Sequence, residues 1–182
     1  MTTLVDALEN ALPTPPSKMS RAAFVATFGP VFEDTPWIAA ATYDAGLDAR
    51  HDTAAGLHAA MVAVLRAAND DAKLALIRAH PDLAGRLALA GALGADSTTE
   101  QKSAGLDQCT PDELERFTSL NQAYQARFGF PFIMAVKGRA RTEVLAAFER
   151  RLAHDRDTEF TQALAQIERI AWLRLHDLLP ET

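Results

Sequence analysis

The chain has 182 residues, of which 48% are hydrophobic and 23% charged, a composition that fits one folded domain and excludes disordered and fibrous proteins. The 18 Lys and Arg residues against 24 Asp and Glu residues give a net charge of −6, which argues against a protein that binds by neutralising nucleic-acid phosphates. A single cysteine, an N-terminus without a basic region followed by an apolar run, and no stretch approaching the about 20 apolar residues of a membrane span predict a cytoplasmic protein.

Helical spacing dominates the chain, because Ala, Leu, Glu and Arg carry the segments between Gly, Pro and short polar caps. We therefore expect an all-α fold, a single compact domain over residues 1–182 with about eight helices. In the N-terminal half, the expected helices run from Ser20 to Phe28, from Pro36 to just before Gly46, from Thr53 to just before Asn69, and from Ala72 to Ala79. The last of these ends near His80, because Pro81 disfavours helical geometry in the residue before it.

The C-terminal half contains two capping-box patterns, Ser97-Thr-Thr-Glu100 and Thr110-Pro-Asp-Glu113. The second opens a long helix that Gly129 ends. Further helices are expected at 83–90, 142–153 and 158–179. Residues 130–136 form the only apolar run that does not look helical, because Pro131 and the β-branched residues favour extended backbone. We expect one short extended segment there, too short to make a sheet.

Signatures of cofactor and metal sites are missing from the sequence. It has no Gly-x-Gly-x-x-Gly turn, no P-loop and no His-Glu-x-x-His, and none of its five histidines forms a Glu-x-x-His pair. We therefore expect no metal site. Cys109 directly precedes the cap at Thr110, which favours a partly buried thiol over a nucleophile.

His80 is the most informative single residue, because it stands at a forced helix end from which a side chain can project into a cleft. An imidazole there could transfer protons near neutral pH. The alternative is that His80 only interacts with the last carbonyl groups of its helix, where an imidazolium is favoured.

Ser97, Glu100 and Gln101 pose the same choice between structure and function. Ser-x-x-Glu is fully explained as the start of a helix. A helix N-terminus also suits an anionic or carbonyl-rich ligand, because its N–H groups lack partners. Gln101 has no capping role, and it offers both a donor and an acceptor to a heterocyclic amide edge.

Arg174 and the extended segment are the remaining candidates. At about 100° per residue, Arg174 falls in the same arc as apolar residues of the last helix, namely Phe160, Leu164, Ile167, Ala171 and Leu178. It is either an arginine whose stem packs while its head reaches water or a carboxylate, or a desolvated fork for a carboxylate or oxyanion. The aromatic residues around Phe132 favour a core role, but the backbone of Phe132, Ile133 and Met134 could bind a ligand through its N–H groups.

Four separated stretches together resemble one enzyme family. They are Ala79-His-Pro-Asp-Leu-Ala-Gly85, Ser97-Thr-Thr-Glu-Gln-Lys-Ser-Ala-Gly-Leu106, Leu120-Asn-Gln-Ala-Tyr-Gln-Ala-Arg-Phe-Gly-Phe-Pro-Phe-Ile133 with Lys137-Gly138, and Ile170-Ala-Trp-Leu-Arg-Leu175. In this order they are similar to the 2-oxo-4-hydroxy-4-carboxy-5-ureidoimidazoline (OHCU) decarboxylases of urate degradation. The resemblance covers nearly the whole chain.

The resemblance implies an all-helical, usually homodimeric carboxy-lyase that converts OHCU to (S)-allantoin without a cofactor. His80 matches the catalytic histidine of the family. The substrate-binding positions implied are Pro81, Ser97, Glu100, Gln101, Phe132, Ile133, Met134 and Arg174. The backbone from Phe132 to Met134 matches the segment that closes on the substrate ring.

The chemistry explains why these residue types suffice. The ring of OHCU can accept the electrons left by departing CO₂, so His80 needs only to handle protons at the reacting carbon. Arg174 is expected on the ring oxygen where negative charge grows, and Glu100 and Gln101 on the ureido and amide N–H groups. The alternative is a non-catalytic helical module that binds a small ligand or a partner, with Arg174 in an internal salt bridge and Ser97 as a plain cap.

Overall fold

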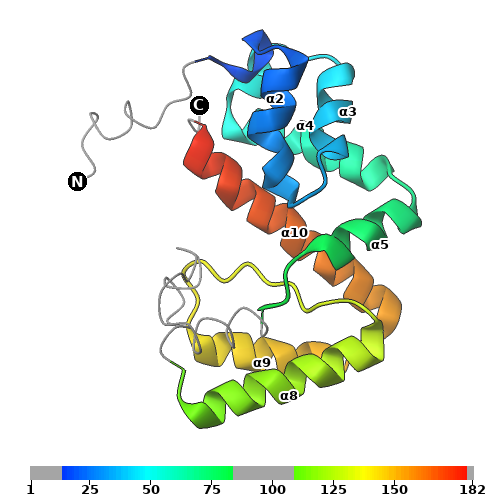
Figure 1. Cartoon of the computed structure of the whole chain (residues 1–182), viewed down its shortest axis with the longest axis vertical. Coiled ribbons are helices and arrows are strands. Elements are labelled where there is room, and N and C mark those ends of the chain that lie inside the picture. Colours follow the sequence, from blue (N-terminus) through cyan, green and yellow to red (C-terminus); the bar gives the residue numbers. More distant parts are fainter. Residues whose placement is uncertain (1–13, 84–108, 180–182) are drawn as a thin grey trace, which may run out of the picture. The chain divides into compact units, whose positions relative to one another are not determined.

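The computed structural model describes residues 14–83 and 109–179 of the chain (Figure 1). All regular structure in these residues is helical, with seven α-helices and three short 3-10 helices. The predicted all-α class is therefore confirmed. The helix predicted from Leu83, apart from that first residue, and the helix predicted after Ser97 lie outside the described residues.

The helices fall into two compact units. The described part of the first unit comprises residues 14–79 and 168–179, and that of the second comprises residues 80–83 and 109–167. The last helix, α10 (Arg156–Leu178), contributes its N-terminal half to the second unit and its C-terminal half to the first.

The first unit is built from short helices around a core of large apolar side chains. Its elements are η1 (Pro16–Lys18), α2 (Arg21–Phe28), η2 (Gly29–Phe32), α3 (Trp37–Asp44), η3 (Ala49–Asp52), α4 (Ala54–Ala67) and α5 (Asp70–Ala79). Helix α3 packs against both α2 and α4 (Figure 1). The fully buried side chains between them include Phe24, Phe28, Phe32, Ile38, Leu57, Met61 and Leu65. Their helical spacing explains why the sequence predicts these helices.

Side-chain caps fix where these helices begin. Ser20 Oγ accepts a hydrogen bond from a backbone N–H of the first turn of α2, as predicted, and Thr53 does the same for α4. Asn69 Oδ1 accepts from the N–H of Ala72 at 2.8 Å. Because of this cap, α5 begins at Asp70 and not at the predicted Ala72.

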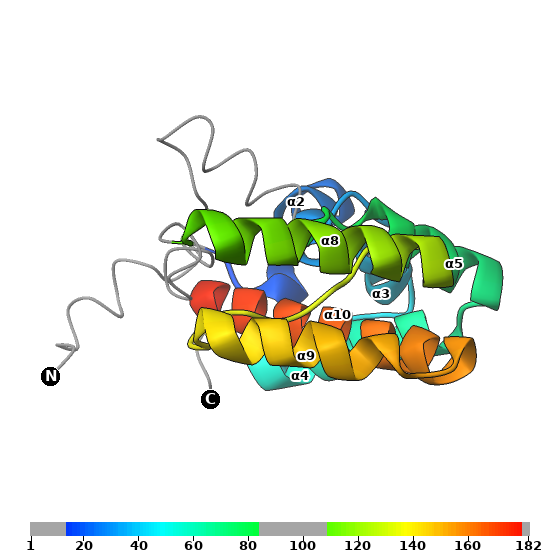
Figure 2. The ribbon, with the colours of Figure 1, turned by 90° about the horizontal axis from the view of Figure 1, so that it is seen from below.

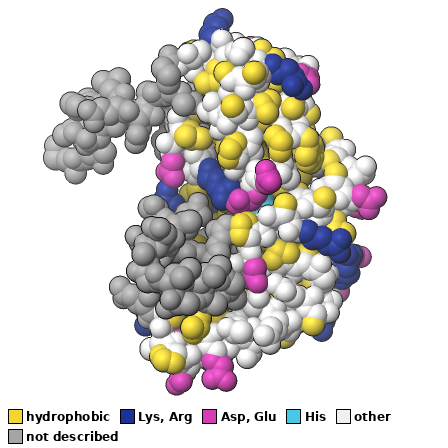
Figure 3. Space-filling view, in the orientation of Figure 1, with side chains coloured by type: hydrophobic (Ala, Val, Ile, Leu, Met, Phe, Trp, Pro, Cys, Tyr) yellow, Lys and Arg dark blue, Asp and Glu magenta, His cyan; other side chains and the backbone are white. Residues whose placement is uncertain are grey.

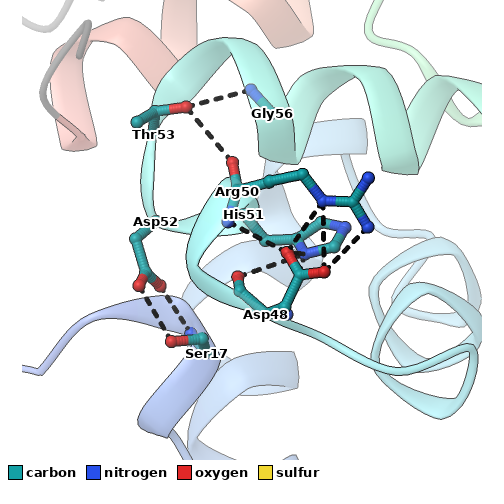
Figure 4. Close-up of polar contacts among 7 residues, drawn as sticks. All are labelled: Ser17, Asp48, Arg50, His51, Asp52, Thr53 and Gly56. Atoms are coloured by element: carbon teal, nitrogen blue, oxygen red, sulfur yellow. Dashed lines mark hydrogen bonds and ion pairs between the residues drawn. The ribbon is translucent and has the colours of Figure 1, made fainter.

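A cluster of polar contacts joins η1, η3 and α4 (Figure 4). The carboxylate of Asp52 accepts from both the N–H and the hydroxyl of Ser17, at 2.7 and 2.8 Å. Asp48 caps η3 by accepting from the backbone N–H of Arg50, and the hydrogen bonds from the Arg50 side chain and backbone lower the pKa of Asp48 to about 2. A Cβ at Gly56 would lie 1.7 Å from the carbonyl oxygen of Arg50, so only glycine fits there.

The second unit contains α8 (Pro111–Phe128), whose ends match the sequence prediction. Thr110 and Glu113 form the expected capping box, in which the Glu113 carboxylate accepts from the Thr110 N–H at 2.9 Å. Gly129 ends the helix in the left-handed region with φ of 76°, a conformation that glycine adopts without strain.

Helix α9 (Arg141–Leu152) lies beside α8 and points in the same direction (Figures 1 and 2). The parallel direction follows from the segment at 129–140, which returns along α8 before α9 begins. Two pairs of residues confirm it: Glu113 with Arg141 joins the starts of the two helices, and Arg127 with His154 joins the last turn of α8 to the residues just after α9. Residues 130–136 belong to no helix or strand, which confirms the prediction that this apolar run is not helical.

The buried face of α10 differs from the predicted one by about one residue position. The side chains that are buried lie in a single i, i+4 row, namely Glu159, Ala163, Ile167, Ala171 and Leu175. Phe160, Leu164 and Leu178, expected at the centre of the face, are only half-buried. Arg174 therefore lies at the edge of the buried face and not within it.

The surface shown in Figure 3 carries Lys and Arg side chains dispersed among Asp and Glu side chains, without a continuous basic area on that face. This distribution agrees with the net charge of −6. None of the helices in residues 14–83 and 109–179 is long and apolar enough to cross a membrane.

Candidate active site

His80 is the first residue of the second unit and directly follows the last residue of α5. The helix ends at Ala79, as the following proline predicts. The His80 side chain is only 5% exposed, so the imidazole lies inside the protein and not on its surface. Pro81 is exposed, and the chain enters the unit again at Leu83.

Asp82 ties the His-Pro-Asp turn to α8. Its Oδ2 accepts hydrogen bonds from the side-chain amides of Asn121 at 2.7 Å and of Gln125 at 2.8 Å, which lie one helical turn apart. Asn121 is buried, and its Oδ1 has no hydrogen-bond partner among the described residues. This anchor is not among the contacts predicted from the sequence, although two amides at i and i+4 on one helix are a recognisable pattern.

The Phe132–Met134 segment lies against the same helix. The Phe132 ring is fully buried, stacks on Phe148 with ring centroids 3.6 Å apart, and meets the Tyr124 ring edge-on at 5.2 Å. Tyr124 lies on α8 between Asn121 and Gln125. Within the second unit, the structure thus attaches two predicted site segments, His80–Asp82 and Phe132–Met134, to the same turn of α8.

Side chains from other elements hold the extended segment at two main-chain groups. Arg151 Nη1 donates to the carbonyl oxygen of Ile133 at 2.7 Å, and Gln166 Oε1 accepts from the N–H of Ala135 at 3.0 Å. In the described part of the chain, we find no hydrogen bond from the backbone N–H groups of Phe132, Ile133 or Met134. Ile133 is buried and Met134 is half-buried.

A buried polar cluster lies behind the segment. Arg151 and Glu159 form an ion pair in which Arg151 is 3% and Glu159 0% exposed, with Arg151 Nε 2.7 Å from Glu159 Oε1. Tyr124 donates its hydroxyl to the same carboxylate, and His154 Nδ1 lies 2.9 Å from Glu159 Oε2. The guanidinium also lies 4.3 Å from the centroid of the Phe132 ring. Arg151, Glu159, Tyr124 and His154 are not among the site residues predicted from the sequence.

Burial in this cluster changes the acidity of Tyr124. Desolvation raises the pKa of the phenol well above its ordinary value of 10.0, and the hydrogen bond to Glu159 raises it further. The hydroxyl therefore stays protonated throughout the physiological range and acts as a permanent donor to Glu159. It is a structural donor and not a candidate general base.

Arg174 lies in the first unit, where α10 passes the η2 turn. Its Nη1 donates to the carbonyl oxygens of Pro30 and Val31 at 3.3 and 3.1 Å, and its Nη2 pairs with the carboxylate of Glu33. Glu33 has a φ of 56°, a region that non-glycine residues rarely adopt. An open pocket of about 400 Å³ adjoins the guanidinium and is lined by Thr27, Pro30, Val31, Arg174 and Leu178.

The other predicted substrate residues, Ser97, Glu100 and Gln101, lie outside the described residues. The described residues contain no group of three or more His, Cys, Asp and Glu side chains placed to hold a metal ion. The part of the site within the second unit therefore consists of a buried imidazole and an extended backbone segment.

Comparison with known proteins places the chain in a family. Residues 17–176 match the family model described as OHCU decarboxylase. This protein belongs to the OHCU decarboxylase family. The match spans every described element from the end of η1 to the last turns of α10, which confirms the resemblance drawn from the four sequence stretches.

Named members of the family are similar over most of this chain. A 2-oxo-4-hydroxy-4-carboxy-5-ureidoimidazoline decarboxylase of Halalkalicoccus jeotgali is 40% identical over 85% of this chain and 84% of its own length. A uric acid degradation bifunctional protein of Bacillus subtilis is 39% identical over 91% of this chain, which spans 32% of that longer protein. A solved (S)-allantoin synthase structure matches 90% of this chain and 52% of its own, with a TM-score of 0.71 and 33% identity.

Proposed function

We propose that this OHCU decarboxylase family member is a carboxy-lyase of urate degradation, which converts OHCU to (S)-allantoin and CO₂ without a cofactor. The observation that carries the proposal is the family match over residues 17–176, which includes the buried His80 and the Phe132–Met134 segment. The named relatives support the same activity, because one is an OHCU decarboxylase and another an (S)-allantoin synthase.

The substrate supplies its own electron sink. The carboxylate of OHCU stands on C4, which also carries a hydroxyl and adjoins the ring C=N at C5. When the bond from C4 to the carboxylate breaks, its electron pair moves into the C=N unit and CO₂ leaves. The ring nitrogen that receives the electron pair takes up a proton from solvent. The C4 hydroxyl then becomes the ring carbonyl of allantoin as it loses its proton, and C5 gains a proton. Adding that proton to one face of C5 makes the product chiral.

His80 is the proposed proton carrier in this sequence. A neutral imidazole accepts the proton of the C4 hydroxyl and returns a proton to one face of C5. Burial of the side chain supports this role, because a proton carrier shielded from water exchanges its proton with the substrate and not with bulk solvent. Removal of water would also strengthen the hydrogen bonds that orient the ring.

The other proposed roles concern binding and orientation. The backbone of Phe132, Ile133 and Met134, with Pro81, would contact the ring. Ser97, Glu100 and Gln101 would hold the ureido and amide groups. Arg174 would stabilise the ring oxygen on which negative charge grows, because an arginine on the leaving carboxylate would stabilise the ground state instead.

We also propose that the enzyme works in the cytoplasm as a homodimer. The cytoplasmic assignment is supported by the single cysteine, and the homodimer by the resemblance to the family. Light scattering of the purified protein tests the dimer directly. A mass of one chain, 19.7 kDa, at the concentrations used for assay would contradict it.

One observation favours the non-catalytic alternative and needs its own test. The ion pair between Arg174 and Glu33 is the internal salt bridge that a ligand-binding helical module would contain. Freshly prepared OHCU is incubated with the purified chain or with buffer, while its disappearance and the optical rotation of the product are followed. The proposal predicts accelerated loss of OHCU and optically active (S)-allantoin. The spontaneous rate with racemic product would support the alternative and overturn the enzymatic proposal.

A further inference from the structure

The extended segment that would bind the ring depends on a buried ion pair from two other helices. We propose, on the basis of the proposed function, that Arg151 on α9 and Glu159 on α10 are positioning residues that hold the Phe132–Met134 backbone in its substrate-binding shape. Neither side chain belongs to the predicted site, and neither would touch the substrate in this account. Their effect on the reaction passes through the main chain at Ile133.

The segment needs an external support because it has no strand partner among residues 14–83 and 109–179. Backbone in a helix or sheet is held by a regular ladder of hydrogen bonds, whereas residues 130–136 belong to neither. Arg151 supplies a donor to the carbonyl oxygen of Ile133 at the centre of the segment. Gln166 supplies the acceptor for the N–H of Ala135 two residues later. Together these bonds fix the peptide planes on both sides of Met134.

The geometry of the guanidinium explains why the residue is an arginine. Its Nε and Nη2 face Glu159, while Nη1 on the other branch of the fork faces Ile133. The same group lies 4.3 Å from the centroid of the Phe132 ring, so it contacts the segment through a side chain as well as a carbonyl. A lysine ammonium keeps the charge but lacks the planar fork that reaches both partners.

The environment of the pair also argues for a positioning role. Arg151 and Glu159 are almost fully buried, and the desolvation cost of a buried ion pair can exceed its Coulombic gain. Apolar side chains could join α9 to α10 without that cost. Besides Glu159 and Tyr124, Arg151 contacts the Ile133 carbonyl and the Phe132 ring, which both belong to the proposed ring-binding segment.

Two variants separate positioning from charge neutralisation. Arg151→Lys keeps a cation beside Glu159 but removes the fork. The double variant Arg151→Met with Glu159→Gln removes both charges, so that no unpaired buried charge remains to unfold the protein. The control is Arg127→Met, because exposed Arg127 also donates to a main-chain carbonyl, that of His154, and lies over the Phe128 ring, but does not touch the segment.

Four measurements are made on each variant: thermal unfolding, the dissociation constant of (S)-allantoin, KM and kcat for OHCU, and amide exchange at Ala135. We expect cooperative unfolding in all of them. In both Arg151 variants, KM and the dissociation constant should rise at least about tenfold and proportionally more than kcat falls, since misplaced binding groups weaken ligand binding. Ala135 exchange should accelerate at least about tenfold relative to amides in the middle of α8. Arg127→Met should match the parent protein.

Each outcome decides the proposal. Parental KM and Ala135 exchange in folded Arg151→Lys would show that charge neutralisation suffices, and would overturn it. Parental values in the double variant would overturn it as well. If the parent protein did not decarboxylate OHCU, the proposed function would fail by itself. Ala135 exchange would still show whether Arg151 holds the segment.

Discussion

Arg174 and Glu33 form an ion pair within the first unit, although they stand 141 residues apart in the sequence. The pair anchors α10 to the residue that follows η2. That residue, Glu33, has a backbone with a positive φ. This contact gives Arg174 a structural role in addition to the substrate role that the family resemblance implies. The two roles lead to different expectations for the two partners.

We expect Arg174→Ala to impair both substrate binding and turnover, because it removes the cation proposed to stabilise developing negative charge. The loss in kcat/KM should reach about 100-fold or more, the size found for removal of an oxyanion donor. Glu33→Gln removes the internal partner but leaves the arginine, so its kcat/KM should stay within a few-fold of the parent protein. Steady-state kinetics on both variants decide between the roles, and equal losses would mean that Arg174 acts only through the ion pair.

Asp82 should support turnover, because its two hydrogen bonds hold the turn that carries His80 against α8. Asp82→Ala removes the acceptor that Asn121 and Gln125 share, and so frees the turn that carries His80. We expect kcat to fall about tenfold or more, because small displacements of a reacting group are costly. Asp112→Ala, on the first turn of α8, is the control and should leave kcat unchanged. An Asp82→Ala enzyme with parental kcat would show that the turn holds its position without this anchor.

Alkaline pH should destabilise the fold through Tyr124. Because burial raises the pKa of this phenol in the folded state, its contribution to stability is complete below pH 10.0, the ordinary value, and is lost as the pH rises above it. Chemical denaturation between pH 8 and 11 should therefore show a steeper loss of unfolding free energy in the parent than in Tyr124→Phe. At neutral pH the Phe variant should be less stable by about 1.5 to 3 kcal/mol, the range for a hydrogen bond to a charged group. Parallel pH profiles would contradict the assignment.

Acid, and not alkali, should weaken the contribution of the Asp48 cap to stability. The hydrogen bonds from Arg50 lower the pKa of Asp48 to about 2, so its contribution is present above the ordinary value of 3.8 and is lost as the pH falls towards 2. A carbon-detected NMR titration should find the Asp48 carboxyl ionised at pH 3 in the parent protein. In Arg50→Ala the same carboxyl should titrate closer to 3.8. An unchanged titration would show that the Arg50 contacts drawn in Figure 4 are not the cause of the lowered pKa.

Local signals in the sequence predict most of the helical boundaries. Thr110 and Glu113 form the expected capping box, Gly129 ends α8, and Pro81 limits α5 to Ala79. Each of these signals acts within one turn of the residue that carries it. A short stretch of sequence is therefore enough to predict where such a helix begins or ends. The same holds for the extended run at 130–136, where Pro131 and the β-branched residues oppose a helix.

Contacts between distant residues are not predictable in this way. Glu159 stands at the start of the buried row of α10, but a carboxylate reads as a surface residue until its partner Arg151 is known. The buried position of Glu159 also explains why the buried face of α10 differs from the predicted one. The prediction used apolar residues alone, counted from Phe160, and so left out the charged member of the buried row. Likewise, nothing in the spacing shows that Arg151 reaches Ile133 or that Asp82 reaches α8.

The most direct test of the whole account compares the allantoin made by the parent protein with that made by folded His80→Ala and His80→Asn. Both variants are first checked for parental helicity by circular dichroism, and the enantiomers are then separated on a chiral column. We predict (S)-allantoin from the parent at an accelerated rate, and racemic allantoin at the spontaneous rate from both variants. Formation of (S)-allantoin at the parental rate by either variant would contradict the role of His80.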